Sequence, residues 1–459
     1  MNIKNMIGNK SFYKMVLVLT IPIIIQNGIT NFVNLLDNVM VGQLSQEEFV
    51  GVGVANQLIF VFNLAMFGAM SGAGIFTAQF FGKSDQDGIR YSFRFKLYAT
   101  LLITAIGVGV FVTLGNPLIS SFLTDDGQSG DPILALRYGE AYLKYALLSL
   151  LPAALAQVYA STLRETGHTV PPMVASIAAV VANAGFNYIL IFGKFGLPAL
   201  GVIGAALGTF LARLIELAIV MIWSHTHTKK VPYIKGVYRR LSIPVPLCRR
   251  IFVKCLPLTL NELLWSGGMT VMNQCYSTRG LDAVSAINIS VTVTNLFNIV
   301  FISLGTAVAI LVGNQLGAGN IEGAKDTDRK IIAFSMVVCV GIGALMAVCS
   351  PLFTMFYNTT DAVRVAAAQL IIVHACLMPF DSFAHNCYFT LRSGGQTFIT
   401  FIFDSFFVWV VSVPTALLLS RFTDLPLLPL YILCVAPNLL KCVIGAILLK
   451  TGKWAKKLV

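Results

Sequence analysis

Long apolar stretches follow one another along this sequence, and charged residues are almost confined to the segments between them. Each stretch reaches the roughly 20 residues that a helix needs to cross a bilayer. Because none of them alternates apolar and polar positions as a membrane β-barrel strand does, they are predicted to be helices. Twelve such spans are expected, centred on residues 14–41, 51–80, 94–115, 133–160, 169–193, 199–224, 251–276, 284–314, 330–350, 362–391, 398–420 and 427–449.

The second half of the chain repeats features of the first half, about 235 residues further on. Pro22, near the start of the first span, corresponds to Pro257 in the seventh. The same offset places residues 78–82 on residues 313–317. Duplicated, very apolar chains are typical of secondary transporters, which bind their cargo between two related halves.

We therefore expect an all-α polytopic membrane protein with twelve transmembrane helices in two homologous six-helix lobes. The N-terminal lobe is predicted to span residues 1–225 and the C-terminal lobe residues 251–459. Residues 226–250 combine many basic residues with three prolines, and we expect them to form a cytoplasmic linker between the lobes.

Composition supports this class. The chain is 56% hydrophobic and 11% charged, whereas about a quarter of the residues in soluble domains are charged. Most of its 32 lysines and arginines fall in the segments on one side of the predicted spans. Cytoplasmic loops are enriched in basic residues, so we expect a multi-pass protein of the cytoplasmic membrane with both termini in the cytoplasm.

The net charge of +12 thus mainly reflects the basic residues of the predicted cytoplasmic segments. The basic residues are spread over many segments and are not set in a nucleic-acid-binding motif, so no nucleic-acid partner is expected. Membrane lipid with anionic headgroups is the expected partner of these charges. No obligate protein partner is inferred.

Motifs of catalysis are missing from the sequence. It has no GxxxxGK[ST] phosphate loop, no G-x-S-x-G elbow and no HExxH pair. The nine cysteines have no metal-type spacing and are expected to fill apolar positions. His225 and His227 alone are a weak basis for a metal site. The chain is not expected to be an enzyme, to hold a metal or to use a cofactor.

Ionisable residues inside the spans are therefore the main functional candidates, because they are costly in a bilayer and usually face a cavity or a partner. At about 1.5 Å rise per residue, Asp37 lies in the outer part of the membrane, where it could meet Asn183 and Asn187 of the fifth span. Glu262 and Asp381 reach matching depths in the second lobe. The candidates are Asp37, Arg213, Glu216, Glu262, His374, Asp381, His385, Asp404 and Lys441.

Several of these have simpler explanations. Arg213 and Glu216 are three residues apart on one helix and are predicted to pair with each other. Asp404 is expected to cap a helix or anchor a loop near the cytoplasmic end of its span. His374, Asp381 and His385 share one face of the tenth span, where they could relay protons or simply hold polar packing contacts.

Five sequence segments resemble the multidrug and toxic compound extrusion (MATE) family, in the same order along the chain. They are residues 35–42, 183–193, 204–209, 313–319 and 391–397, the last followed by Asp404 and Trp409. The resemblance covers nearly the whole length. It implies two six-helix lobes that export cationic or amphiphilic compounds by alternating access, driven by entry of protons or sodium ions.

The resemblance also implies roles for single residues. Asp37 matches the first-lobe acid that couples ion binding to substrate release, and Asn183 and Thr209 match polar members of that site. Asn187 stands where many relatives have a second aspartate, which weakens the case for sodium there. Pro22 matches a proline that lets the first helix bend.

In the second lobe, Asp381 matches an acid of the norfloxacin-exporter branch. Glu262 lies about one turn before the position of that branch's other acid. Either lobe could therefore carry the coupling ion.

The expected function is secondary active multidrug efflux by proton- or sodium-coupled antiport. The alternative is a flippase for lipid-linked cell-envelope precursors. Such flippases generally line their cavity with more cationic residues, whereas only Arg213 and Lys441 are basic and well inside the spans here. A channel is a further alternative, but the sequence has no pore-loop signature.

Overall fold

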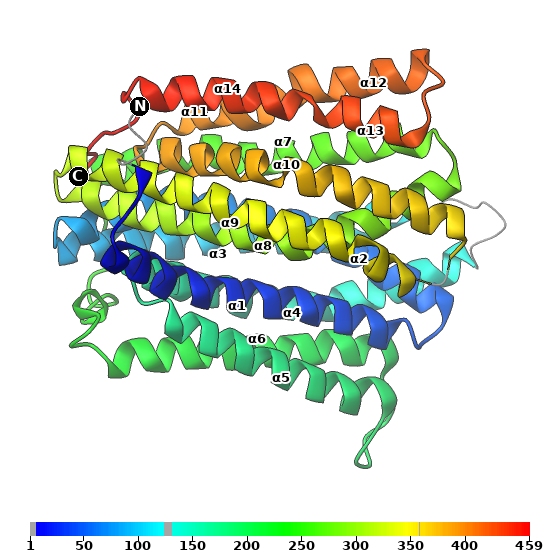
Figure 1. Ribbon diagram of the computed structural model, residues 1–459. Helices are drawn as coiled ribbons and strands as arrows, with labels where there is room; N and C mark the ends of the chain where they lie inside the picture. The colour runs from blue at the N-terminus through cyan, green and yellow to red at the C-terminus, as the bar shows by residue number, and fades with distance from the viewer. Residues whose placement is uncertain (1–5, 124–130, 358) are drawn as a thin grey trace. The chain divides into compact units, whose positions relative to one another are not determined.

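The computed structural model describes residues 6–123, 131–357 and 359–459, without the side chains of residues 33–35 and 38. Within that part of the chain all regular elements are helical, which confirms the predicted class (Figure 1). The long helices are α1 Lys10–Val41, α2 Gln46–Gly82, α3 Gln86–Ser120, α4 Pro132–Glu165, α5 Val170–Phe192, α6 Gly201–Thr226, α7 Val245–Ser277, α8 Leu281–Gly317, α9 Ile321–Met355 and α10 Asp361–Ser393.

The last two expected spans are interrupted helices. The eleventh begins with α11 Thr397–Phe401, continues through two π-helical segments, and ends with α12 Val413–Phe422. The π-helical segments are η3 Ile402–Phe406 and η4 Val408–Ser412. The twelfth consists of α13 Leu427–Val435 and α14 Pro437–Lys450, which meet at a proline that cannot continue the hydrogen bonding of the preceding turn.

Eleven helices in the described residues are long and apolar enough to cross a membrane. The seventh expected span is formed as α7, which has 33 residues but is not among the eleven. The reason is composition, because α7 carries Asn261, Glu262, Asn273 and Gln274 between its apolar residues.

Contacts divide the described chain into two compact units. We call residues 25–77 and 86–252 the N unit, and residues 6–24, 78–85 and 253–459 the C unit. The helices α1 and α2 each contribute to both: α1 passes into the N unit after Ile24, and α2 leaves it at Ala78. The lobes expected from the sequence were each one continuous stretch, residues 1–225 and 251–459, whereas each unit here combines separate stretches of the chain.

In the N unit, α5 and α6 lie side by side (Figure 1). Their closeness depends on glycine, since a Cβ at Gly204 would lie 2.6 Å from the carbonyl carbon of Leu190. The connection begins at Gly193, whose φ of 65° is readily adopted by glycine. This tight helical hairpin carries three of the four first-lobe candidates, Asn183, Asn187 and Thr209.

The segment between α6 and α7 packs on α3. Arg94, only 6% exposed, donates from Nε to the carbonyl of Val237 (2.8 Å) and from Nη1 to the carbonyl of Ser242 (3.1 Å). Tyr98 donates to the carbonyl of Leu241 (2.8 Å). These hydrogen bonds attach the segment to α3 of the N unit.

The C-terminal tail folds back onto the C unit. Trp454 is buried at 3% exposure in a core cluster that includes Val308 and Leu391. Gln79, which is fully buried, donates from Nε2 to the carbonyl of Lys456 (3.2 Å) and accepts the backbone N–H of Leu458 at Oε1 (2.7 Å). The tail is thus held by the buried side chain of Trp454 and by hydrogen bonds to its main chain at residues 456 and 458.

Candidate functional site

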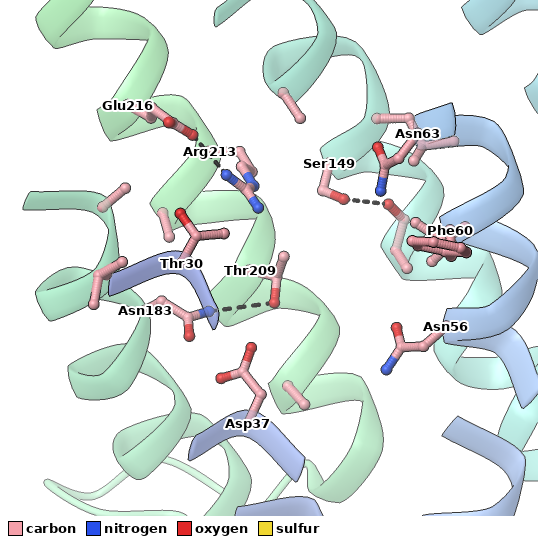
Figure 2. Close-up of a pocket in the computed structure, with 18 of the residues that line it drawn as sticks. Thr30, Asp37, Asn56, Phe60, Asn63, Ser149, Asn183, Thr209, Arg213 and Glu216 are labelled. Carbon is pink, nitrogen blue, oxygen red and sulfur yellow. Dashed lines mark hydrogen bonds and ion pairs between the residues drawn. The ribbon is translucent and has the colours of Figure 1, made fainter. Parts of the chain in front are cut away.

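The N unit contains a cavity of about 340 Å³ between α1, α2, α4, α5 and α6 (Figure 2). Its wall mixes apolar side chains with acids, amides and hydroxyls. The polar lining residues are Thr30, Asp37, Asn56, Asn63, Tyr142, Ser149, Ser176, Asn183, Thr209, Arg213 and Glu216. A cavity of this size and polarity is typical of a small-molecule site.

A chain of hydrogen bonds joins the four residues that the sequence suggested for the first lobe. Asn187 Nδ2 donates to Asp37 Oδ1 (2.7 Å) and to Asn183 Oδ1 (3.3 Å). Asn183 Nδ2 in turn donates to Thr209 Oγ1 (3.3 Å). The structure therefore brings Asp37, Asn183, Asn187 and Thr209 together, as the depth argument predicted for the first three. The side chains of Asn34 and Asn38, which are neighbours of Asp37 in the sequence, are not among those described.

Helix geometry explains this convergence. Asn183 and Asn187 are one turn apart, so they face the same side of α5. On α6, Gly208 leaves room for the side chain of Asn187, whose Oδ1 a Cβ at that position would overlap. Asp37 lies one turn before the end of α1 at Val41.

A second carboxylate, Glu216, lines the same cavity as Asp37. Arg213 Nη1 donates to Glu216 Oε2 (2.7 Å), which confirms the predicted pair. Glu216 Oε1 accepts from Ser176 Oγ, which accepts from Gln26 Nε2, both at 2.9 Å. Arg164 Nη1 extends the chain to Gln26 Oε1 (3.3 Å). Polar contacts thus continue from the cavity to the end of α4.

Arg213 and Glu216 were predicted to pair, but their place in the site was not predicted. Helical spacing indicates it, because Thr209, Arg213 and Glu216 fall at i, i+4 and i+7 on one face of α6. Tyr142, which was not predicted, donates from its hydroxyl to Asn56 Oδ1 (3.0 Å) across the cavity wall. No pattern in the sequence distinguishes Tyr142 from the other aromatic residues.

The second-lobe candidates have separate partners in the C unit. Glu262 accepts from the hydroxyl of Tyr388 (2.8 Å), and Asp381 accepts from Asn438 Nδ2 (3.3 Å). Among the described residues no hydrogen bond joins the two acids directly. Their partners lie on α10 and α14, so each acid is held by a different helix pair.

The expectation that Asp404 caps a helix or anchors a loop was wrong. Asp404 lies inside the π-helical segment η3, forms an ion pair with Lys441 of α14, and accepts from Asn261 Nδ2 (2.9 Å). Lys441 also interacts electrostatically with Asp381. π-Helical turns often occur at functional sites, and here one places a carboxylate against a lysine within the spans.

The histidines of α10 make packing contacts. His374 Nε2 lies 3.2 Å from Asn298 Oδ1, and His385 contacts the rings of Phe301 and Phe389. Among the described residues no hydrogen bond links either histidine to Asp381. The structure therefore favours the packing interpretation over the proton relay.

Pro22, the last sequence candidate, lies inside α1 in the stretch that belongs to the C unit. In the described residues no group of three or more His, Cys, Asp and Glu side chains could hold a metal ion.

Comparison with known proteins gives a consistent assignment. The MatE family model matches residues 22–189 and 257–418. A probable multidrug resistance protein NorM from Thermotoga maritima is 23% identical over 446 residues, which is 96% of this chain and 93% of that protein. The multidrug resistance protein MdtK from Edwardsiella ictaluri is 25% identical, covering 88% of this chain and 87% of its own length.

Solved structures have the same fold. A crystal structure of MATE in complex with MaL6 superposes with a TM-score of 0.83 at 20% identity, covering 98% of both chains. An outward-facing multidrug resistance MATE family transporter of the MOP superfamily gives 0.84 at 19% identity, again covering 98% of both. With the family model matched in both halves, the chain belongs to the MATE family of transporters.

Proposed function

We propose that this protein is a multidrug efflux antiporter of the cytoplasmic membrane, with both termini in the cytoplasm. Its relatives carry the names of multidrug resistance proteins. The observation that carries the proposal is the cavity of the N unit, in which Asp37 accepts a hydrogen bond from Asn187 beside an aromatic and amide wall. Such a cavity fits a cationic or amphiphilic molecule of drug size.

Asp37 is proposed as the coupling group. An ionised carboxylate in a cavity attracts a cationic substrate, and a proton that reaches it removes that attraction. Proton and substrate then compete for the same site, which drives exchange if the outward- and inward-facing states bind them differently. Asn183, Asn187 and Thr209 orient the carboxylate, and Pro22 lets α1 bend between the two states.

The groups around Asp37 favour a proton over sodium as the coupling ion. Its described partner is the amide N–H of Asn187, which is a donor and cannot be a cation ligand in that orientation. The only other carboxylate among the described lining residues, Glu216, is already paired with Arg213. The second-lobe acids Glu262 and Asp381 are the alternative location for the coupling ion.

Dye efflux from proteoliposomes tests the proposal. Proteoliposomes that contain wild type, Asp37→Asn or Glu262→Gln are loaded with ethidium. A proton gradient or, separately, a sodium gradient is then imposed across their membrane. We expect proton-driven efflux in wild type and Glu262→Gln and its loss in Asp37→Asn, with equal protein in the membrane. Sodium-driven efflux lost only in Glu262→Gln would instead place coupling in the second lobe. No efflux under either gradient would contradict multidrug export.

A further inference from the structure

Arg213 is the only basic residue among the described residues that line the cavity. Its side chain is 38% exposed, whereas that of its partner Glu216 is 13% exposed. The side chain of Arg213 is therefore the more exposed member of the pair. A cavity that served cations alone would gain nothing from a positive group on its wall.

The hydrogen bonding of Arg213 is incomplete. A guanidinium has five N–H donors in a planar fork, which suits two parallel bonds to one carboxylate. Here Nη1 alone donates to Glu216, and in the described part of the chain the other nitrogens have no hydrogen-bond partner. Figure 2 shows one guanidinium nitrogen bonded to Glu216 and another on the side away from it.

Glu216 does not complete the fork, because Arg213 donates to only one of its oxygens. Oε1 accepts from Ser176, and only Oε2 faces Arg213. A simple structural ion pair, in which the two side chains satisfy each other, therefore does not describe this arrangement. The free donors of Arg213 match an additional carboxylate, supplied by a ligand.

The cavity also presents a negative group to the same ligand. Asp37 lines it, and Asp37 and Arg213 are close enough to interact electrostatically. Phe60 and Tyr142 provide apolar surface on the wall formed by α2 and α4. The site thus has a positive end, a negative end and an aromatic side.

We propose that Arg213 selects zwitterionic amphiphiles: its free donors bind the substrate's carboxylate, while the substrate's cationic group faces Asp37. This inference rests on the proposed function, in which the same cavity holds the exported molecule. It adds that a carboxylate on the substrate increases affinity, where a purely cationic compound uses Asp37 alone.

A matched pair of dyes tests this directly. Tetramethylrhodamine carries a carboxylate and a delocalised cation, and its methyl ester carries the cation only. Binding of each to the purified full chain in lipid nanodiscs is measured by fluorescence anisotropy. The variant Arg213→Gln/Glu216→Gln removes one positive and one negative charge, so the net charge of the cavity is unchanged.

The double variant is expected to bind tetramethylrhodamine at least about tenfold more weakly than wild type, because charge-assisted hydrogen bonds are lost. Its affinity for the methyl ester should stay within about twofold, since the ester has no carboxylate for Arg213 to bind and the net charge of the cavity is unchanged. Equal weakening of both dyes, or no change in either, would overturn the proposal.

A second variant covers the case in which the double variant does not fold. Arg213→Lys keeps the charge but loses the planar fork, so the ratio of zwitterion to ester affinity is expected to fall. An unchanged ratio in the folded protein would contradict a carboxylate site at Arg213. Ester efflux that persists in wild type while tetramethylrhodamine does not bind would overturn this inference alone. Absent ester efflux would count against the exporter itself.

Discussion

Asn187 donates a 2.7 Å hydrogen bond to Asp37 across 150 residues of sequence, from Nδ2 of the amide to Oδ1 of the carboxylate. The same amide nitrogen also donates to Asn183 Oδ1, so the carboxylate is linked by hydrogen bonds to two residues of α5. A change in the charge of Asp37 therefore alters contacts between α1 and α5 directly.

This contact predicts the effect of a second acid. Asn187→Asp would replace the donor by a carboxylate next to Asp37, and carboxylate oxygens are ligands that hard cations prefer. We expect the variant to bind sodium about tenfold or more tightly than wild type, since a second charge at about 4 Å adds attraction of this order. Binding of ²²Na⁺ to the purified protein measures the effect, and Asn187→Ala is the control. Equal sodium binding in all three proteins would refute the prediction.

The close packing of α5 and α6 predicts a difference between two glycines. Gly204→Ala places a Cβ 2.6 Å from the carbonyl of Leu190 and 2.8 Å from the nitrogen of Ile191, so the helices must separate, at a cost of about 1–3 kcal/mol. Thermal unfolding in detergent should show a lower Tm, and dye binding should weaken because Asn187 moves away from Asp37. Gly185→Ala on α5, where a Cβ would meet nothing within 4 Å, is the matched control and should not lower the Tm, since alanine favours a helix interior over glycine by about 0.5–1 kcal/mol.

The buried pair of Lys96 and Glu165 predicts a non-additive loss of stability. Lys96 is fully buried and also donates to Ser161 (3.1 Å) and Thr162 (3.2 Å). Lys96→Met leaves the carboxylate of Glu165 without its ion-pair partner, which should cost about 3–5 kcal/mol.

Thermal unfolding of Lys96→Met, Glu165→Gln and the double variant measures this coupling. The double variant should be more stable than Lys96→Met, because no isolated charge remains. Simple addition of the two single effects would show that the pair is not coupled.

His168, in the loop between α4 and α5, predicts a pH effect on stability. Burial lowers the pKa of His168 below its usual value, with Lys230 contributing in the same direction. The folded state thus holds fewer protons on this residue than the unfolded state, so its contribution to stability is lost as pH falls below about 6.5. His168→Gln should reduce the fall in Tm between pH 7 and pH 5. An identical pH profile in the variant would contradict the assignment.

Much of the fold and part of the site followed from the sequence. Spans of apolar residues gave the helices, because only helices and closed barrels satisfy the backbone in a bilayer. Depth along the helices brought Asp37, Asn183 and Asn187 together, since rise per residue is nearly constant. Thr209 needed the family resemblance, although its place four residues before Arg213 pointed to the same face.

The errors concern contacts between helices that are distant in sequence. Asp404 was expected to cap a helix or anchor a loop, and nothing in the sequence indicates that Lys441 faces it from α14. Arg213 and Glu216 were paired correctly, but Ser176, which donates to the other oxygen of Glu216, lies on another helix. Propensity and periodicity describe one helix at a time, whereas these contacts depend on how helices are rotated about their axes.

Gln79 binds the backbone of residues 456 and 458, so this contact depends on the spacing of residues in the C-terminal tail more than on their side chains. Gln79 binds a carbonyl and an N–H, groups that every residue other than proline supplies equally. The two hydrogen bonds therefore do not depend on the side chains at 456 and 458 as long as proline stays out of position 458, whereas deleting a single residue before them would move the wrong backbone groups under Gln79. Related chains that keep these hydrogen bonds to Gln79 should vary in tail sequence. They should conserve the spacing from Trp454 to residues 456 and 458.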